Sequence, residues 1–222
     1  MGLTIHYSLH SGTKSPRKAR QLIEALRQKA LDLPFKEVGE VIDLSGDDCD
    51  FERRERDDPQ RWLLIQAGQH VERDGYGYCV LPKRVIAFST WPGEGCEKAN
   101  FGLALSPASI QAQRGRLRTG LAGWFWSSFC KTQYASNADR GGVPHFLRCH
   151  LSVVKMLDHA RALGILGHVS DEGGFWDKRD VKALAQEVGE WNEFIAGKFE
   201  ELWKLFGDGM ESPVEQLKER KK

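Results

Sequence analysis

The chain has 222 residues, of which 41% are hydrophobic and 28% are charged. This balance is typical of one globular domain and argues against long disordered segments. The 32 basic and 31 acidic side chains leave a net charge of +1, so no overall field attracts the protein to nucleic acid or to an anionic membrane.

The first quarter of the chain alternates strand and helix signals. Apolar residues at every second position predict a strand over 3–9, and Ser15 and Pro16 supply the cap and the first-turn proline of a helix over 15–33. Residues 37–44 predict a second strand. The resulting β–α–β unit would have a right-handed crossover if its strands are parallel.

The middle of the chain reads mainly as strands and loops. The mixed-charge run at 45–60 predicts a solvated loop. The apolar run in 62–71 predicts a third strand, and the Asp-Gly pair that follows is a hairpin signal. Residues 85–90 and 101–105 predict two more strands, and 106–120 predicts a basic loop.

The segment GWFWSSFCKTQY, at 123–134, is the most informative one. Side chains alternate along a strand, so Trp124 and Trp126 share one face and Lys131 lies on the other. The tryptophans are expected in the core. A buried lysine needs a carboxylate partner, and the expected partners are Glu97, Asp171 and Glu172.

The last third is predicted to be mostly helical. A helix over 143–163 carries apolar stripes on two sides, which indicates burial. Residues 165–169 predict a short strand. Asp177 is the expected N-cap of a long amphipathic helix that runs to about residue 206, and the polar tail 207–222 follows.

Together these elements predict a single α+β domain over residues 1–206. A mixed or antiparallel sheet of about five to seven strands, which begins with the β–α–β unit, would be covered on one face by the N-terminal helix and two C-terminal helices. No internal repeat or linker divides the chain.

Two glycine-containing loops carry the candidate carboxylates. The loop PGEGCE at 92–97 could bind a hard cation or supply an acid and a base through Glu94 and Glu97. The loop SDEGGFW at 170–176 places Asp171 beside Glu172. The structural alternatives are a wide strand connection that needs glycine for the first loop, and a turn stabilised by the aspartate side chain for the second.

Histidine offers one further catalytic candidate. His6 lies in the middle of the first strand, on its more polar face, whereas His150 lies near an apolar helix stripe. A lone histidine in such positions usually has a structural hydrogen bond. We therefore place His6 at the margin of the predicted site, and no HExxH or HxH spacing adds a metal motif.

The segments MGLTIHYSL, VIAFSTWPGEGCEKANFGL, GWFWSSFCKTQYASN, FLRCHLSVVKMLDHA and VSDEGGFWDKRDV resemble a family of uncharacterised bacterial proteins of about this length. The resemblance covers most of residues 1–196. It implies no activity, ligand or site, because none is known for that family.

Residues 1–7, 129–132 and 170–173 are similar to a second uncharacterised group, found in phages and bacteria. That group has a Met-Gly-x-Thr-His-Tyr start, a Phe-Cys-Lys-Thr motif and a later Ser-Asp-Gly. Here His6 comes one residue later and Glu172 is inserted. The similarity implies that the first strand, the lysine strand and the aspartate loop meet in space.

The leading hypothesis is a hydrolase or phosphoryl-transfer enzyme that uses a divalent cation, Mg²⁺ or Mn²⁺. Glu97 and Asp171 would bind the metal, and Glu172 would be a ligand or a base. Lys131 would face developing negative charge, and His6 is the third catalytic candidate.

Two other hypotheses stay open. The first is a non-catalytic module that binds a small ligand or a protein partner, with the lysine and carboxylates as a structural ion-pair network. The second, ranked last, is nucleic-acid binding through the alternating residues Arg114, Arg116 and Arg118.

The cellular environment is predicted from what the sequence lacks. Five cysteines without CxxC or CxC spacing argue against a zinc ribbon or finger. There is no apolar run of the ~18 residues that a membrane span needs, and no signal-peptide pattern at the N-terminus. We expect a soluble, cytoplasmic protein with reduced thiols and no membrane association.

Overall fold

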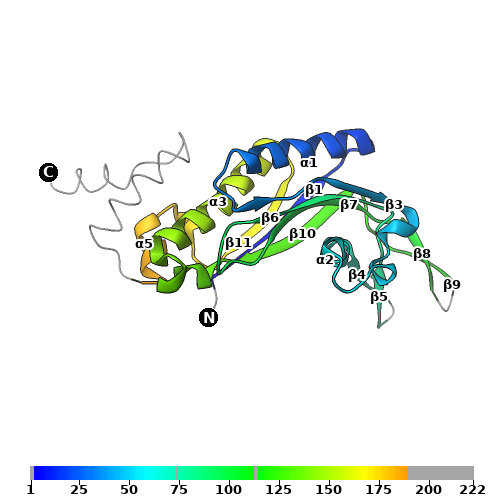
Figure 1. Ribbon diagram of the computed structural model, residues 1–222. Helices are drawn as coiled ribbons and strands as arrows, with labels where there is room; N and C mark the ends of the chain where they lie inside the picture. Colours follow the sequence, from blue (N-terminus) through cyan, green and yellow to red (C-terminus); the bar gives the residue numbers. More distant parts are fainter. Residues whose placement is uncertain (1–2, 74, 113–114, 190–222) are drawn as a thin grey trace.

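The computed structural model describes residues 3–73, 75–112 and 115–189, and its centre is a seven-stranded antiparallel sheet (Figure 1). The strands run in the order β11-β1-β10-β7-β6-β2, and β3 also pairs with β6. Their bounds are β1 Thr4–Ser11, β2 Glu37–Val38, β3 Ile42–Ser45, β6 Arg84–Trp91, β7 Ala99–Leu105, β10 Trp124–Lys131 and β11 Leu166–Asp171. The predicted α+β class is confirmed.

Helices lie on both faces of this sheet. Figure 1 shows α1 and α3 above it and α2 below it. The α-helices are α1 Pro16–Leu31, α2 Pro59–Ala67, α3 Gly142–Ala162, α4 Phe175–Lys178 and α5 Val181–Gln186. Two hairpins, β4 Gln69–Arg73 with β5 Tyr76–Val80 and β8 Ser109–Ala112 with β9 Gly115–Arg118, and four short 3₁₀ helices complete the described elements. None of the helices in this part of the chain is long and apolar enough to cross a membrane.

Local sequence signals explain the first helix. The Ser15 hydroxyl accepts a hydrogen bond from the Lys18 amide at 3.3 Å, and Pro16 occupies the first turn. One apolar face of α1 is fully buried, and its members are Ala19, Ile23, Leu26 and Ala30. Burying each large aliphatic side chain stabilises the fold by about 1.5–3 kcal/mol, so packing on the sheet holds this helix in place.

The alternation of β10 also follows the prediction. Trp124 and Trp126 are buried, with 1% and 0% of their surfaces exposed. On the neighbouring strand β1, Tyr7 is buried on the same face and stacks on Phe101, with ring centroids 5.2 Å apart. The main core therefore fills the space between the sheet and the layer of α1 and α3, and β10 ends at Lys131 rather than at residue 134.

Three local predictions are wrong. Residues 62–71, predicted as a strand, form the end of α2 and the start of β4. The reason is a helix start just upstream, where the Asp58 carboxylate accepts from the Gln60 amide at 2.8 Å and Pro59 is the first residue. The basic loop at 106–120 contains the β8–β9 hairpin, and the N-cap of the last described helix is Asp180 rather than Asp177.

The predicted β–α–β unit is formed by β1, α1 and β2. β2 pairs antiparallel with β6 at the edge of the sheet, and because every neighbouring pair from β1 to β2 is antiparallel, β2 runs in the same direction as β1, with β10, β7 and β6 between them. The predicted long C-terminal helix begins as α5, which is assigned over six residues. Its remainder beyond residue 189 and the tail 207–222 lie outside the described residues.

Candidate functional site

A cavity lies on the face of the sheet that α1 and α3 do not cover. On this face α2 packs against β6, β7 and β10, whereas β1 and β11 lie beyond its cover. The cavity has a volume of about 330 Å³. It is lined by His6, Tyr7, Ser8, Gln66, Ser127, Ser128, Phe129 and His168. We call this hollow the histidine cavity.

Two copies of a His-x-Ser motif meet in the histidine cavity. His6-Tyr7-Ser8 lies on β1, and His168-Val169-Ser170 lies on β11, its antiparallel neighbour. Tyr7 pairs with Val169. The histidines therefore occupy diagonal positions on the open face, where neighbours are about 7–8 Å apart and can reach one ligand. Both imidazole side chains are exposed.

An irregularity in the β1–β11 pairing shapes this arrangement. The register shifts between Tyr7 and Leu9, so that Ser8 faces two residues of β11. The Ser8 hydroxyl accepts a hydrogen bond from the His168 amide at 2.9 Å. A Cβ at Gly167 would lie 2.5 Å from that hydroxyl oxygen. Glycine at 167 is therefore needed to bring Ser8 and His168 together.

Other cavity residues add polar groups and one aromatic wall. The His6 ring lies 5.8 Å from the Phe129 ring, centroid to centroid. On α2, the side-chain oxygen of Gln66 accepts from the Asn100 amide group at 2.8 Å. This bond leaves the NH₂ group of Gln66 as a donor for a ligand. On β10, Ser127 pairs with Ser8 across the strands and adds a second hydroxyl.

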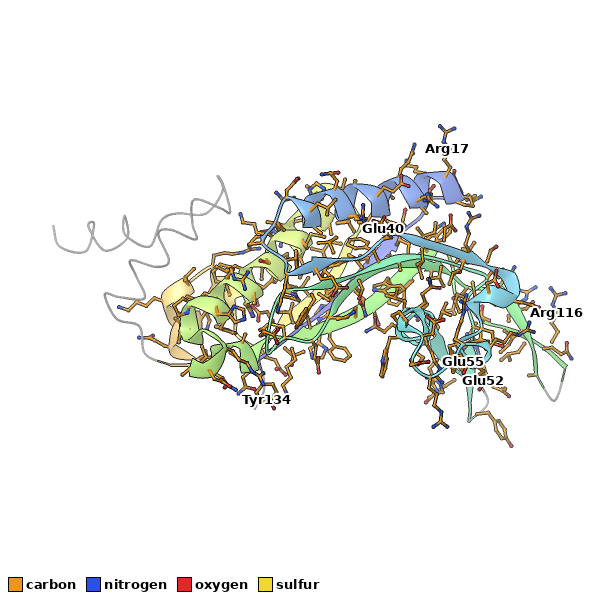
Figure 2. All side chains as sticks on the ribbon, in the orientation of Figure 1. Arg17, Glu40, Glu52, Glu55, Arg116 and Tyr134 are labelled. Carbon is orange, nitrogen blue, oxygen red and sulfur yellow. The ribbon has the colours of Figure 1, made fainter. Side chains whose placement is uncertain are left out.

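Lys131 does not join the carboxylates as predicted. Its ammonium group lies 4.8 Å from the centre of the Tyr134 ring, and it forms no salt bridge with any residue that the structure describes. Figure 2 shows Tyr134, which the Lys131 ammonium group contacts, at one end of the sheet; Arg116 lies at the opposite end. Lys131 is the last residue of β10, and it is not among the residues that line the histidine cavity.

The exposed carboxylates have separate environments. Glu172 accepts a hydrogen bond from the Thr4 amide at 2.9 Å and so fastens the start of β1 to the end of β11. Glu97 donates its backbone N–H to the Lys131 carbonyl oxygen at 2.9 Å. Its side chain lines a second cavity beside α2, not the histidine cavity. Neither carboxylate forms an ion pair among the described residues.

Asp171 lies on the other face of the sheet, beneath α3, and its side chain has no exposed surface. Its carboxylate accepts hydrogen bonds from the His150 Nε2 at 3.2 Å and from the amides of Gly173 and Trp176 at 2.9 Å each. Burial alone would raise the pKa of Asp171, but these donors outweigh it and hold the pKa below its usual value.

Thr132 extends this contact into a three-residue chain. Because the Asp171 carboxylate can only accept, His150 carries its proton on Nε2, and Nδ1 accepts from the Thr132 hydroxyl at 2.9 Å. The order of groups is that of a nucleophile, base and orienting acid. All three side chains are buried, however, with 0% of Thr132 and of His150 exposed. This series of hydrogen bonds therefore has a structural role: it links the residue that follows β10 to α3 and to the end of β11.

The predicted metal ligands are not close together. Glu97 lines the cavity beside α2, whereas Asp171 bonds to His150 of α3. The described part of the chain contains no group of three or more His, Cys, Asp or Glu side chains that could hold a metal ion. A Mg²⁺ or Mn²⁺ site made by these two carboxylates remains a prediction, without geometric support among the described residues.

The glycines of the 92–97 loop have a structural explanation. Gly95 has a φ of +79°, and a Cβ there would lie 2.5 Å from the Tyr134 carbonyl carbon. The loop therefore presses backbone against backbone, which only glycine permits. Its other carboxylate, Glu94, is exposed and pairs with Lys36 at 2.5 Å.

His168 is the residue that sequence reasoning missed. A signal was present, because the pattern His-x-Ser occurs in both the first predicted strand and the last. The convergence of the first strand, the lysine strand and the aspartate loop, expected from the second resemblance, is seen in the pairing of β1 with both β10 and β11. Comparisons with protein-family models, curated proteins and solved structures give no match.

Proposed function

We propose that the protein is a hydrolase or phosphoryl-transfer enzyme that cleaves a phosphate ester, with His6 and His168 as a general acid–base pair. One observation carries the proposal: two exposed imidazoles from neighbouring strands line the same cavity. Imidazole is the side chain that most readily gives and takes protons near neutral pH. The proposal keeps the predicted reaction class and His6, and it replaces Lys131 and Glu172 by His168.

In the proposed hydrolysis, one imidazole takes a proton from water as the water oxygen bonds to phosphorus. The other imidazole, initially protonated, gives its proton to the leaving oxygen as the bond from phosphorus to that oxygen breaks. Two histidines separated by a diagonal step across the strands suit this reaction, because the attacking and leaving groups lie on opposite sides of the phosphorus.

Neutral donors in the cavity would bind the phosphoryl oxygens. The Ser8 hydroxyl already accepts from the His168 amide, which leaves its own hydrogen to donate. Ser127 supplies a second hydroxyl. Donors fixed before the reaction stabilise charge that develops in the transition state. The register shift at Ser8 therefore brings the Ser8 hydroxyl beside the His168 amide, and it leaves that hydroxyl free to donate to a phosphoryl oxygen.

The test measures hydrolysis of bis(4-nitrophenyl) phosphate by His6→Gln, His168→Gln and the double variant. We expect each single variant to lose about 10²–10⁴-fold in kcat/KM, because each removes one proton-transfer partner. His10→Gln is the matched control. His10 is an exposed histidine on β1 that does not line the cavity, and we expect its loss to change kcat/KM less than ~3-fold.

The pH profile distinguishes acid–base chemistry from simple binding. The unmodified protein should give a bell-shaped dependence of kcat/KM on pH, and each histidine variant should lose one limb of it. Full activity in both single variants would contradict the proposal. Loss of activity in the presence of a chelator would contradict a mechanism that uses the two histidines alone and would add a metal ion to the reaction.

A non-catalytic ligand-binding module is the second candidate function. The specific observation in its favour is a second cavity beside α2, which is larger than the histidine cavity and is lined in part by the exposed side chain of Trp62. Ligand binding without turnover, unchanged by His168→Gln, would support this alternative.

A further inference from the structure

A second cavity adjoins the histidine cavity. Its volume is about 570 Å³, and it lies between α2 and the ends of β6, β7 and β10. It is lined by Pro59, Trp62, Leu63, Ile65, Gln66, Ser89, Glu97, Lys98, Asn100 and Phe129. Gln66 and Phe129 line both cavities, so a ligand can extend from one into the other. We call this hollow the aromatic cavity.

Two large rings of the aromatic cavity are exposed. Trp62 has 67% of its surface exposed and Phe129 has 44%. Trp62 lies on the second turn of α2, whose Leu63, Leu64 and Ala67 are buried. The helix therefore packs through those residues and does not need the indole for the core. Exposed rings that line a concave surface are typical of binding sites rather than of ordinary surface.

Polar groups at this cavity suit the edge of a flat heterocycle. The NH₂ group of Gln66 and the Lys98 ammonium group can donate, and the Glu97 carboxylate can accept. The side chain of Asn100 is already used, because its NH₂ group bonds to Gln66 and its oxygen accepts from the Ser89 hydroxyl. Amide and carboxylate groups of this kind pair with the exocyclic groups of nucleobases.

We infer that the aromatic cavity is a nucleobase subsite, and that the substrate is a nucleotide whose phosphate lies in the histidine cavity. The position of Phe129 connects the two parts. It pairs with His6 across the strands, and its ring contacts the His6 imidazole. A base stacked against Phe129 and Trp62 therefore holds the attached phosphate beside the acid–base pair. The identity of the phosphate group rests on the proposed function.

The test compares the binding of AMP and ribose 5-phosphate to the full chain by isothermal titration calorimetry. The two ligands share the sugar and the phosphate, and only AMP has a base. We expect AMP to bind at least about 5-fold more tightly, and Trp62→Ala to weaken AMP binding by about 5- to 100-fold, because stacking on one aromatic ring contributes on that scale. Binding of ribose 5-phosphate should not change in Trp62→Ala.

Tyr134→Ala is the matched control, because Tyr134 is an exposed ring outside both cavities. It should leave AMP binding unchanged. Equal affinities for AMP and ribose 5-phosphate, or AMP binding that Trp62→Ala does not weaken, would overturn the nucleobase inference. Circular dichroism of each variant verifies that it is folded, and Trp62→Phe, which keeps an aromatic ring, should restore most of the affinity.

The nucleobase inference and the acid–base proposal can fail independently of each other. If AMP binds through Trp62 but the histidine variants hydrolyse phosphodiesters normally, the acid–base proposal fails and the nucleobase subsite stands. If the histidine variants lose hydrolysis but AMP binds no more tightly than ribose 5-phosphate, the nucleobase inference fails and the acid–base proposal stands.

Discussion

The buried contact between Asp171 and His150 joins the end of β11 to α3, and the substitution Asp171→Asn measures its contribution to stability. Asparagine has nearly the same shape but no charge, and it places an NH₂ group where a carboxylate oxygen accepts. The carboxylate has three donors, which are the His150 ring and the amides of Gly173 and Trp176. At least one of these donors would then face another donor.

The magnitude follows from burial. Neither the Asp171 nor the His150 side chain has exposed surface, so water cannot replace a lost hydrogen bond. A hydrogen bond to a charged group contributes about 1.5–3 kcal/mol, and an unsatisfied buried donor costs about 1–3 kcal/mol. After partial relaxation of the loop, we expect the free energy of unfolding to fall by about 2–4 kcal/mol.

The measurement is urea unfolding at pH 7, followed by circular dichroism, for the unmodified chain, Asp171→Asn and one control variant. Asp177→Asn is the control, because Asp177 is an exposed aspartate on α4 with the same chemical change. It should alter stability by less than about 0.5 kcal/mol. A similarly small effect of Asp171→Asn would refute the reasoning, since it would mean that the buried hydrogen bonds contribute nothing net.

The pH dependence gives a second check on Asp171. Its pKa is lower in the folded protein than in the unfolded chain, because the hydrogen bonds outweigh the effect of burial. Its contribution is therefore present above the unfolded carboxyl pKa of about 3.9 and is lost as the pH falls through the folded value. The stability difference between the unmodified chain and Asp171→Asn should narrow below about pH 4. A difference that stays constant down to pH 3 would contradict this assignment.

Three further substitutions test single contacts. Gly95→Ala should cost about 2–4 kcal/mol of unfolding free energy, because its φ is +79° and the added Cβ would collide with the Tyr134 backbone; circular dichroism during urea unfolding measures it. Tyr7→Phe should cost only about 0.5–1.5 kcal/mol in the same assay, since the Asn100 carbonyl oxygen that loses the 2.8 Å tyrosine bond keeps a second donor. Lys131→Gln should change phosphodiester hydrolysis less than ~3-fold, whereas a loss above 10-fold would restore Lys131 as a catalytic residue.

Several elements could be predicted from the sequence because their causes are local. The cap and proline at Ser15 and Pro16 start α1, and the period of two along β10 places both tryptophans in the core. The strand predicted over 62–71 was wrong for an equally local reason, since a short apolar run suits a strand or a buried helix face. The cap at Asp58 distinguishes the two.

The candidate site depended on relations that the sequence does not contain. The first and last strands of the sheet carry the same His-x-Ser pattern, yet Ser8 and His168 are 160 residues apart in the chain. Periodicity shows which face of its own strand a side chain takes. It does not show which strands become neighbours, because strand order follows from how all the apolar faces pack at once.

The alternation of side chains along a strand also separates two of the predicted site residues. Asp171 and Glu172 are adjacent in sequence, but consecutive residues at a strand end point to opposite faces, so Asp171 is buried under α3 and Glu172 is exposed. The α+β class and those elements with clear local signals, such as α1 and β10, could be predicted from the sequence alone. Tertiary packing alone decided that His6 would meet His168 beside Phe129, because only the assembled sheet places β1 between β11 and β10.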